Sequence, residues 1–79
     1  MVVKLRNHEG KLFVKDILDI DMDMHVDETN SKGKSSYQVV INSKFILADT
    51  FRTQEEAEDA MLGLASARND LEAELRDSI

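Results

Sequence analysis

The hydrophobic pattern of this 79-residue chain changes its period once, close to residue 53. Up to that point, apolar and polar residues mostly alternate, as they do in strands that bury one face of a sheet. Beyond it, apolar residues recur every three or four positions without an intervening proline, which predicts one long helix. The chain therefore predicts an α+β fold, with an antiparallel sheet over residues 1–52 and a helix over residues 53–79.

Alternating segments predict strands at residues 2–6, 11–17, 18–28 and 37–42, and a tight turn at Asn42-Ser43 leads into a further apolar segment at 44–51. Gly10 can adopt the positive φ angle that the first turn requires. The last segment folds back on the strand before it through a tight loop, because pairing Ile41 with Phe45 keeps the apolar faces together. The polar segment 29–36 predicts a flexible loop. We therefore expect a single domain over residues 1–79, built as a four-stranded antiparallel β-meander followed by one helix on one sheet face (ββββα).

Length and composition exclude several functions. A chain this short buries only about 60% of its unfolded surface, so oligomerisation is a natural way to add buried area. The absence of cysteine excludes disulfides and thiolate chemistry and fits a reducing cytoplasm. A net charge of -6 argues against direct nucleic-acid binding, which needs a basic patch. Because no apolar run is long enough for a signal sequence or a membrane span, we expect a cytoplasmic protein with no membrane contact.

The segment 18–28, LDIDMDMHVDE, alternates strictly and is strongly acidic. On a strand, its carboxylates would form one row facing away from the apolar side chains. We interpret this row first as a solvated face that prevents edge-to-edge aggregation. Our second interpretation is a surface for a basic protein partner, and the candidate partner-binding residues are Asp19, Asp21, Asp23 and Asp27.

The same segment carries the weak candidates for a metal site, which are Asp21, Asp23 and His25. They share one strand face, but the glycine and the distal glutamate of a calcium loop are missing, so we expect no cofactor. The two aspartates would stand about 6.7 Å apart along a strand, which is within the range of paired-carboxylate hydrolases. Such a pair also needs a pocket that removes water, and an open strand face offers none. We therefore expect no catalytic residues and no enzyme.

The helix suggests a second surface. Thr53 and Glu56 have the spacing of a capping box, which predicts where the helix begins. A helix over residues 54–77 would be about 36 Å long, whereas strands of ordinary length span only about 20 Å. Because its apolar stripe continues past the end that a sheet can cover, we expect a homodimer through the helix; the alternative is a frayed helix end. The candidate interface residues are Leu64, Arg68, Leu71, Leu75 and Ile79.

The helix start at residues 51–58, F-x-T-x-E-E-A-E, resembles those of small acidic proteins from bacterial and phage genomes. The resemblance covers this junction alone and implies no functional residues. The leading hypothesis is a small, acidic, non-enzymatic interaction module that binds an unidentified protein, as a phage- or prophage-type accessory or inhibitor protein would. The alternative is an acidic nucleic-acid mimic, whose carboxylates replace phosphates in the basic groove of a nucleic-acid-binding protein.

Overall fold

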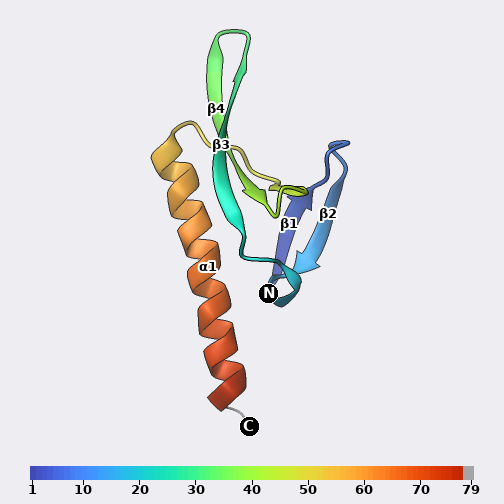
Figure 1. The fold of residues 1–79 in the computed structure, drawn as a ribbon, viewed down its shortest axis with the longest axis vertical. Coiled ribbons are helices and arrows are strands. Elements are labelled where there is room, and N and C mark those ends of the chain that lie inside the picture. Colours follow the sequence, from blue (N-terminus) through green and yellow to red (C-terminus); the bar gives the residue numbers. More distant parts are fainter. Residues whose placement is uncertain (78–79) are drawn as a thin grey trace.

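The computed structural model describes residues 1–77 and has an α+β fold, as the sequence predicts (Figure 1). An antiparallel five-stranded sheet is followed by one long helix that packs on it. The elements are β1 (Val2–Arg6), β2 (Leu12–Asp16), the short 3₁₀ helix η1 (Ile17–Asp19), β3 (Met24–Ser31), β4 (Lys34–Ile41), β5 (Phe45–Leu47) and α1 (Gln54–Asp77). The molecule is elongated, with extents of 52 × 26 × 16 Å.

The order of the strands differs from the expected meander, and there are five strands rather than four. Strand β4 begins before residue 37, the turn after it leads into the separate strand β5, and the sheet order is β2-β1-β5-β4-β3. Strand β5 pairs with β4 on one side and with β1 on the other, where Leu5 lies opposite Leu47. Consequently β1 lies inside the sheet, and β2 and β3 form its two edges. The connection from β2 to β3 must therefore cross from one edge of the sheet to the other.

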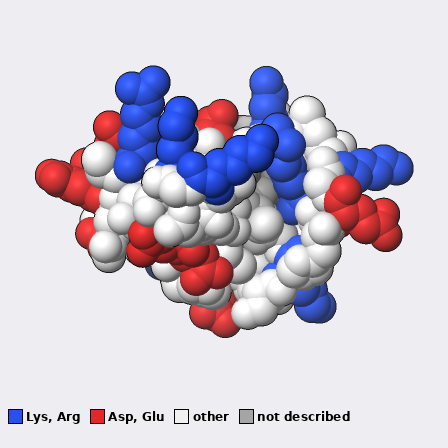
Figure 2. Space-filling model, turned by 90° about the horizontal axis from the view of Figure 1, so that it is seen from above, with Lys and Arg blue, Asp and Glu red and all other residues white. Residues whose placement is uncertain are grey.

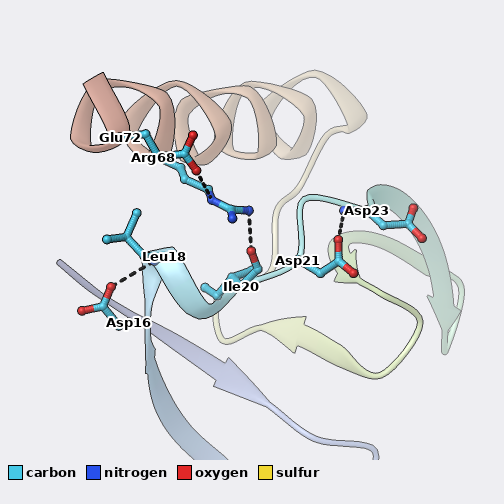
Figure 3. Close-up of polar contacts among 7 residues, drawn as sticks. All are labelled: Asp16, Leu18, Ile20, Asp21, Asp23, Arg68 and Glu72. Carbon is cyan, nitrogen blue, oxygen red and sulfur yellow. Dashed lines mark hydrogen bonds and ion pairs between the residues drawn. The ribbon is translucent and has the colours of Figure 1, made fainter. Parts of the chain in front are cut away.

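This connection occupies residues 17–23, and it corrects the expected strand over 18–28. Strand β3 begins only at Met24. The Asp16 carboxylate accepts a hydrogen bond from the Leu18 amide (3.0 Å) and so caps η1 (Figure 3). Ile17 and Ile20, which lie three positions apart, are both buried, as a helical turn against the core requires. The alternation of apolar and acidic residues here reflects a turn and an extended connection, not a continuous strand.

The hairpin between β3 and β4 corrects the expected flexible loop at 29–36. Both strands continue to a two-residue turn, Lys32-Gly33, where Ser31 pairs with Lys34. Lys32 and Gly33 have φ angles of 53° and 77°, which match the type I′ turn that fits the natural twist of a hairpin. The segment is polar because this part of the hairpin extends beyond the core, so polar composition indicated solvent exposure rather than a loop (Figure 1).

Two local predictions about turns are confirmed. Gly10 has a φ of 82° in the turn between β1 and β2. The turn after β4 pairs Ile41 with Phe45, as the apolar pattern predicts. Two of its residues, Asn42 and Ser43, have φ angles of 52° and 55°. Side chains like these tolerate the left-handed region because they are short and polar.

The core lies between one sheet face and the helix. Leu5, Ile17, Val39 and Ile41 have the largest fully buried side chains, and Ala57 and Leu64 are the buried residues of the helix. The helix packs against β3, β4 and η1, so it covers mainly one half of the sheet. Its C-terminal end projects past the strands, as its predicted length requires (Figure 1).

The start of the helix is also confirmed. Phe51 and Tyr37 exchange two backbone hydrogen bonds of 2.8 Å, which fix the chain beside β4 just before the helix. The Glu56 amide then donates to the Thr53 hydroxyl (3.2 Å), the N-cap contact expected from the sequence. The helix therefore begins at Gln54, directly after its cap.

Candidate functional site

The helix leaves one face of the sheet uncovered. Leu5, Val39 and Ile41 point toward the helix and are buried, so their neighbours along each strand point the opposite way. We call this second surface the open face. It is formed by Val2, Lys4, Arg6, Leu12, Val14, His25, Asp27, Gln38, Val40 and Ile46.

Strand pairing arranges part of the open face in a row. Arg6 lies opposite Ile46, Ile46 opposite Val40, and Val40 opposite His25. Side chains that are directly opposite in an antiparallel sheet stand about 4.5–5.5 Å apart at Cβ. The row therefore places two apolar side chains between a guanidinium group and an imidazole.

Two adjoining pockets lie over this row. Their volumes are about 350 and 330 Å³, and they share His8, Gln38 and Ile46. Arg6 and Thr50 line the first pocket, whereas His25 and Asp27 line the second. The two pockets form a shallow groove, which has an apolar floor and hydrogen-bonding groups along its sides.

His8 reaches this groove from the turn between β1 and β2. The Asn7 carboxamide oxygen accepts hydrogen bonds from the Glu9 and Lys11 amides, both 3.0 Å long, and so fixes the turn. His8 Nε2 then lies 3.2 Å from the Ser43 carbonyl oxygen, in the turn that joins β4 to β5. The imidazole thus connects two turns beside the groove, where it lines both pockets. Sequence alone did not indicate this role for His8, because its partner Ser43 is distant in the chain.

The expected row of carboxylates is dispersed. Asp19 belongs to η1, and Asp21 and Asp23 lie in the connection, where the Asp23 amide donates to the Asp21 carboxylate (3.2 Å; Figure 3). Asp27 is on β3, where its carboxylate lies 3.6 Å from His25 Nε2. Both of these side chains are about half exposed, so this pair contributes little to stability.

The metal candidates are separated in the same way, because Asp21 and Asp23 lie in the connection and His25 lies on a strand of the open face. Within residues 1–77, the structure has no group of three or more histidine, aspartate or glutamate side chains placed to hold a metal ion. The same residues include no helix that is both long and apolar enough to cross a membrane.

A third pocket, of about 230 Å³, lies where the connection passes the turn after β4. Its charged lining residues are Lys15, Asp19, Asp21 and Lys44. The Lys15 ammonium nitrogen stands 5.2 Å from the centre of the Phe45 ring, which also meets Phe13 edge to face. Sequence alternation did not predict this pocket, because it depends on how the connection crosses the sheet.

The expected dimer residues on the helix are divided between the core and the surface. Leu64 is buried, Leu71 is partly buried against the core, and Leu75 is 53% exposed. Arg68 donates to the Ile20 carbonyl oxygen (2.6 Å) and to Glu72 (3.0 Å), so it fastens the helix to the connection (Figure 3). Ile79 lies outside the described residues.

Charge is unevenly distributed over the surface. Seen from the tip of the β3–β4 hairpin, lysine and arginine side chains gather along one side, whereas acidic side chains occupy other parts of the outline (Figure 2). No protein-family model, curated protein or solved structure matches this chain.

Proposed function

We propose that this chain is a small, non-enzymatic interaction module that binds a polypeptide segment of another protein in the groove of the open face. The observation that carries the proposal is the row from Arg6 to His25, with Ile46 and Val40 between them. Shallow surfaces with an apolar centre and a polar rim are typical of protein interfaces.

The charges at the two ends of the groove define the chemistry of the segment. Arg6 lines one end and Asp27 the other. An extended segment fits when an apolar side chain rests on the floor, a carboxylate faces Arg6 and a basic side chain faces Asp27. Such opposite charges give orientation and specificity more than affinity.

The other elements of the proposal follow from composition. An intracellular setting fits a chain without cysteine. The role of an accessory or inhibitor protein, as in phages, fits its size and acidity. The alternative is an acidic nucleic-acid mimic, in which the carboxylates from Asp19 to Asp23 would be presented by the connection and not by a strand.

A homodimer belongs to the same proposal, but the helix is a poor surface for it. Leu64 is in the core, and Arg68 is engaged with the connection. Among the described candidates on the stripe, Leu75 is the one leucine that is more than half exposed.

Comparative capture tests the groove. Tagged wild-type protein, Arg6→Glu and Arg76→Glu would be used to capture proteins from the host cell, and each retained protein would then be purified and titrated. Arg76 is exposed near the end of the helix, so its variant makes the same charge change far from the groove. We expect Arg6→Glu to weaken binding about tenfold or more and Arg76→Glu to change it by less than about twofold. Equal affinities of the wild type, Arg6→Glu and Arg76→Glu for a retained protein would contradict the proposal. A steep decrease in affinity with rising salt concentration that depends on the acidic residues of the helix would favour the mimic.

A further inference from the structure

Strand β2 is an edge of the sheet, and half of its backbone groups point away from the protein. The Asn7 amide donates to the Lys11 carbonyl, and the Ile17 amide donates to the Met1 carbonyl. Because hydrogen-bonded pairs alternate along an antiparallel ladder, the odd-numbered residues of β2 direct their N–H and C=O groups to β1. The corresponding groups of Leu12, Val14 and Asp16 therefore point outward from the edge.

The side chains on this edge are apolar and exposed. Leu12 is 55% exposed and Val14 is 59% exposed, and Val2, on the adjacent strand, is 66% exposed. Exposed apolar edge strands are templates for pairing with another strand unless charges or bulges protect them. Leu12 and Val14 thus combine outward-directed backbone groups with exposed apolar side chains.

The opposite edge is protected. Strand β3 presents exposed acidic side chains at Asp27 and Glu28, and the helix packs against this strand. Pairing two copies through β3 would concentrate carboxylates at the junction, and like charges destabilise strand pairs. Of the two edges, β2 is therefore the one suited to self-association.

We propose that two copies of the chain pair through β2, antiparallel and with Val14 opposite Val14 of the second copy. In this register each outward-directed residue meets another one, because Leu12 of each copy lies opposite Asp16 of the other. All three outward-directed pairs can then exchange their two backbone hydrogen bonds. The two sheets join into one continuous sheet, and both open faces lie on the same side.

The side chains favour this register over its neighbours. It places Phe13 of each copy opposite Lys15 of the other, where a lysine can rest against an aromatic ring as Lys15 already does against Phe45. It also brings Asp16 of one copy into the cross-strand row of Arg6 of the other, since Arg6 pairs with Leu12. Arg6 and the Asp16 of the second copy then stand two strands apart with Leu12 between them, so their opposite charges attract without direct contact.

Shifting one copy by two residues keeps each side chain on the same face of the sheet, but it places like charges opposite each other. In one direction Lys15 faces Lys15, and in the other Lys11 faces Lys15. Such oppositions destabilise antiparallel strands. The register centred on Val14 is therefore the one that the sequence of β2 supports. This inference rests on the homodimer of the proposed function, but it is independent of the groove and its partner.

Single cysteines test the register directly, since the chain has none of its own. Across a hydrogen-bonded pair, Cα atoms stand about 5.5 Å apart, within the range of disulfides. We expect Val14→Cys to form a covalent dimer under mild oxidation at about 10 µM, a concentration chosen above a micromolar Kd. Leu12→Cys is the matched control, because its two copies would be more than about 13 Å apart along the strands. No covalent dimer with Val14→Cys, or equal yields for both variants, would overturn the register.

Sedimentation equilibrium at about 100 µM separates this interface from other modes of dimerisation. We expect the wild type to be a dimer and Val14→Pro to be a monomer, because proline at this position removes only an outward N–H group. Leu62→Lys, which changes an exposed leucine on the helix, should remain a dimer. A wild-type monomer would refute the homodimer altogether. A dimer that survives Val14→Pro, in protein with an unchanged circular dichroism spectrum, but dissociates in Leu75→Glu would refute the β2 interface and leave the homodimer intact.

Discussion

Arg68 is the side chain that ties the helix to the connection between the two sheet edges, so its removal should cost more than an ordinary surface substitution. Its guanidinium donates to the carbonyl oxygen of Ile20, a buried residue, over 2.6 Å. A hydrogen bond from a charged donor contributes about 1.5–3 kcal/mol. The accompanying pair with Glu72, one helical turn away, adds only about 0.3–0.5 kcal/mol.

We therefore expect Arg68→Met, which keeps an unbranched apolar stem but lacks the guanidinium group, to lower the free energy of unfolding by about 2 kcal/mol. In a domain of this size, that loss corresponds to a decrease in Tm of roughly 8–16 °C. Glu72→Gln is the control, because it removes the charge pair and leaves the Ile20 contact, and it should lower Tm by less than about 4 °C. Thermal melts followed by circular dichroism measure both changes. Equal Tm values for Arg68→Met and the wild type would refute the view that this contact anchors the connection.

Three local substitutions test the turns, the cap and the connection. Thr53→Ala should reduce stability by about 1 kcal/mol in a urea titration, because the Glu56 amide loses its acceptor, and no change would place the start of the helix elsewhere. Lys32→Asn should raise the free energy of unfolding by up to about 1 kcal/mol and so raise the urea midpoint, since asparagine tolerates the φ of 53° at that position better than lysine does; a lower midpoint would argue against a type I′ turn. Asp21→Asn combined with Asp23→Asn should alter stability by under about 1 kcal/mol, because both side chains are exposed, whereas a loss of several kcal/mol would mean that these carboxylates support the fold.

Features that depend on residues close together in the chain could be predicted from the sequence. The cap at Thr53, the register of Ile41 with Phe45 and the positive φ of Gly10 all follow from short-range geometry. The α+β class also follows, because the period of the apolar pattern distinguishes strands from helix.

The order of the strands could not be obtained in this way. Pairing β1 with β5 joins Leu5 to Leu47 across most of the sheet region, and nothing in either segment specifies that partner. Without this pairing, the connection at 17–23 had no reason to cross the sheet, so its alternation was assigned to a strand. The same error placed the acidic residues in one row.

The open face shows a second limit of sequence reasoning. Lys4, Arg6 and Gln38 are polar residues of this face, but Val40 and Ile46 become its floor only when β1, β5 and β4 are adjacent. His8 likewise reaches the groove only because its turn lies beside Ser43. The candidate site therefore depends on the sheet order more than on any motif.

The adjacency of β1 and β5 is consequently the central claim, since it creates the groove, places β2 at an edge and requires the crossing connection. A nuclear Overhauser measurement on labelled protein tests it most directly. Leu5 and Leu47 face each other, and because the neighbouring Ala48 amide bonds to the Lys4 carbonyl, they form a non-hydrogen-bonded pair. In such a pair the Cα atoms approach to about 4.5 Å. We predict a strong Hα–Hα contact between Leu5 and Leu47. Its absence, together with Hα–Hα contacts between β2 and β3, would establish the meander and contradict the account.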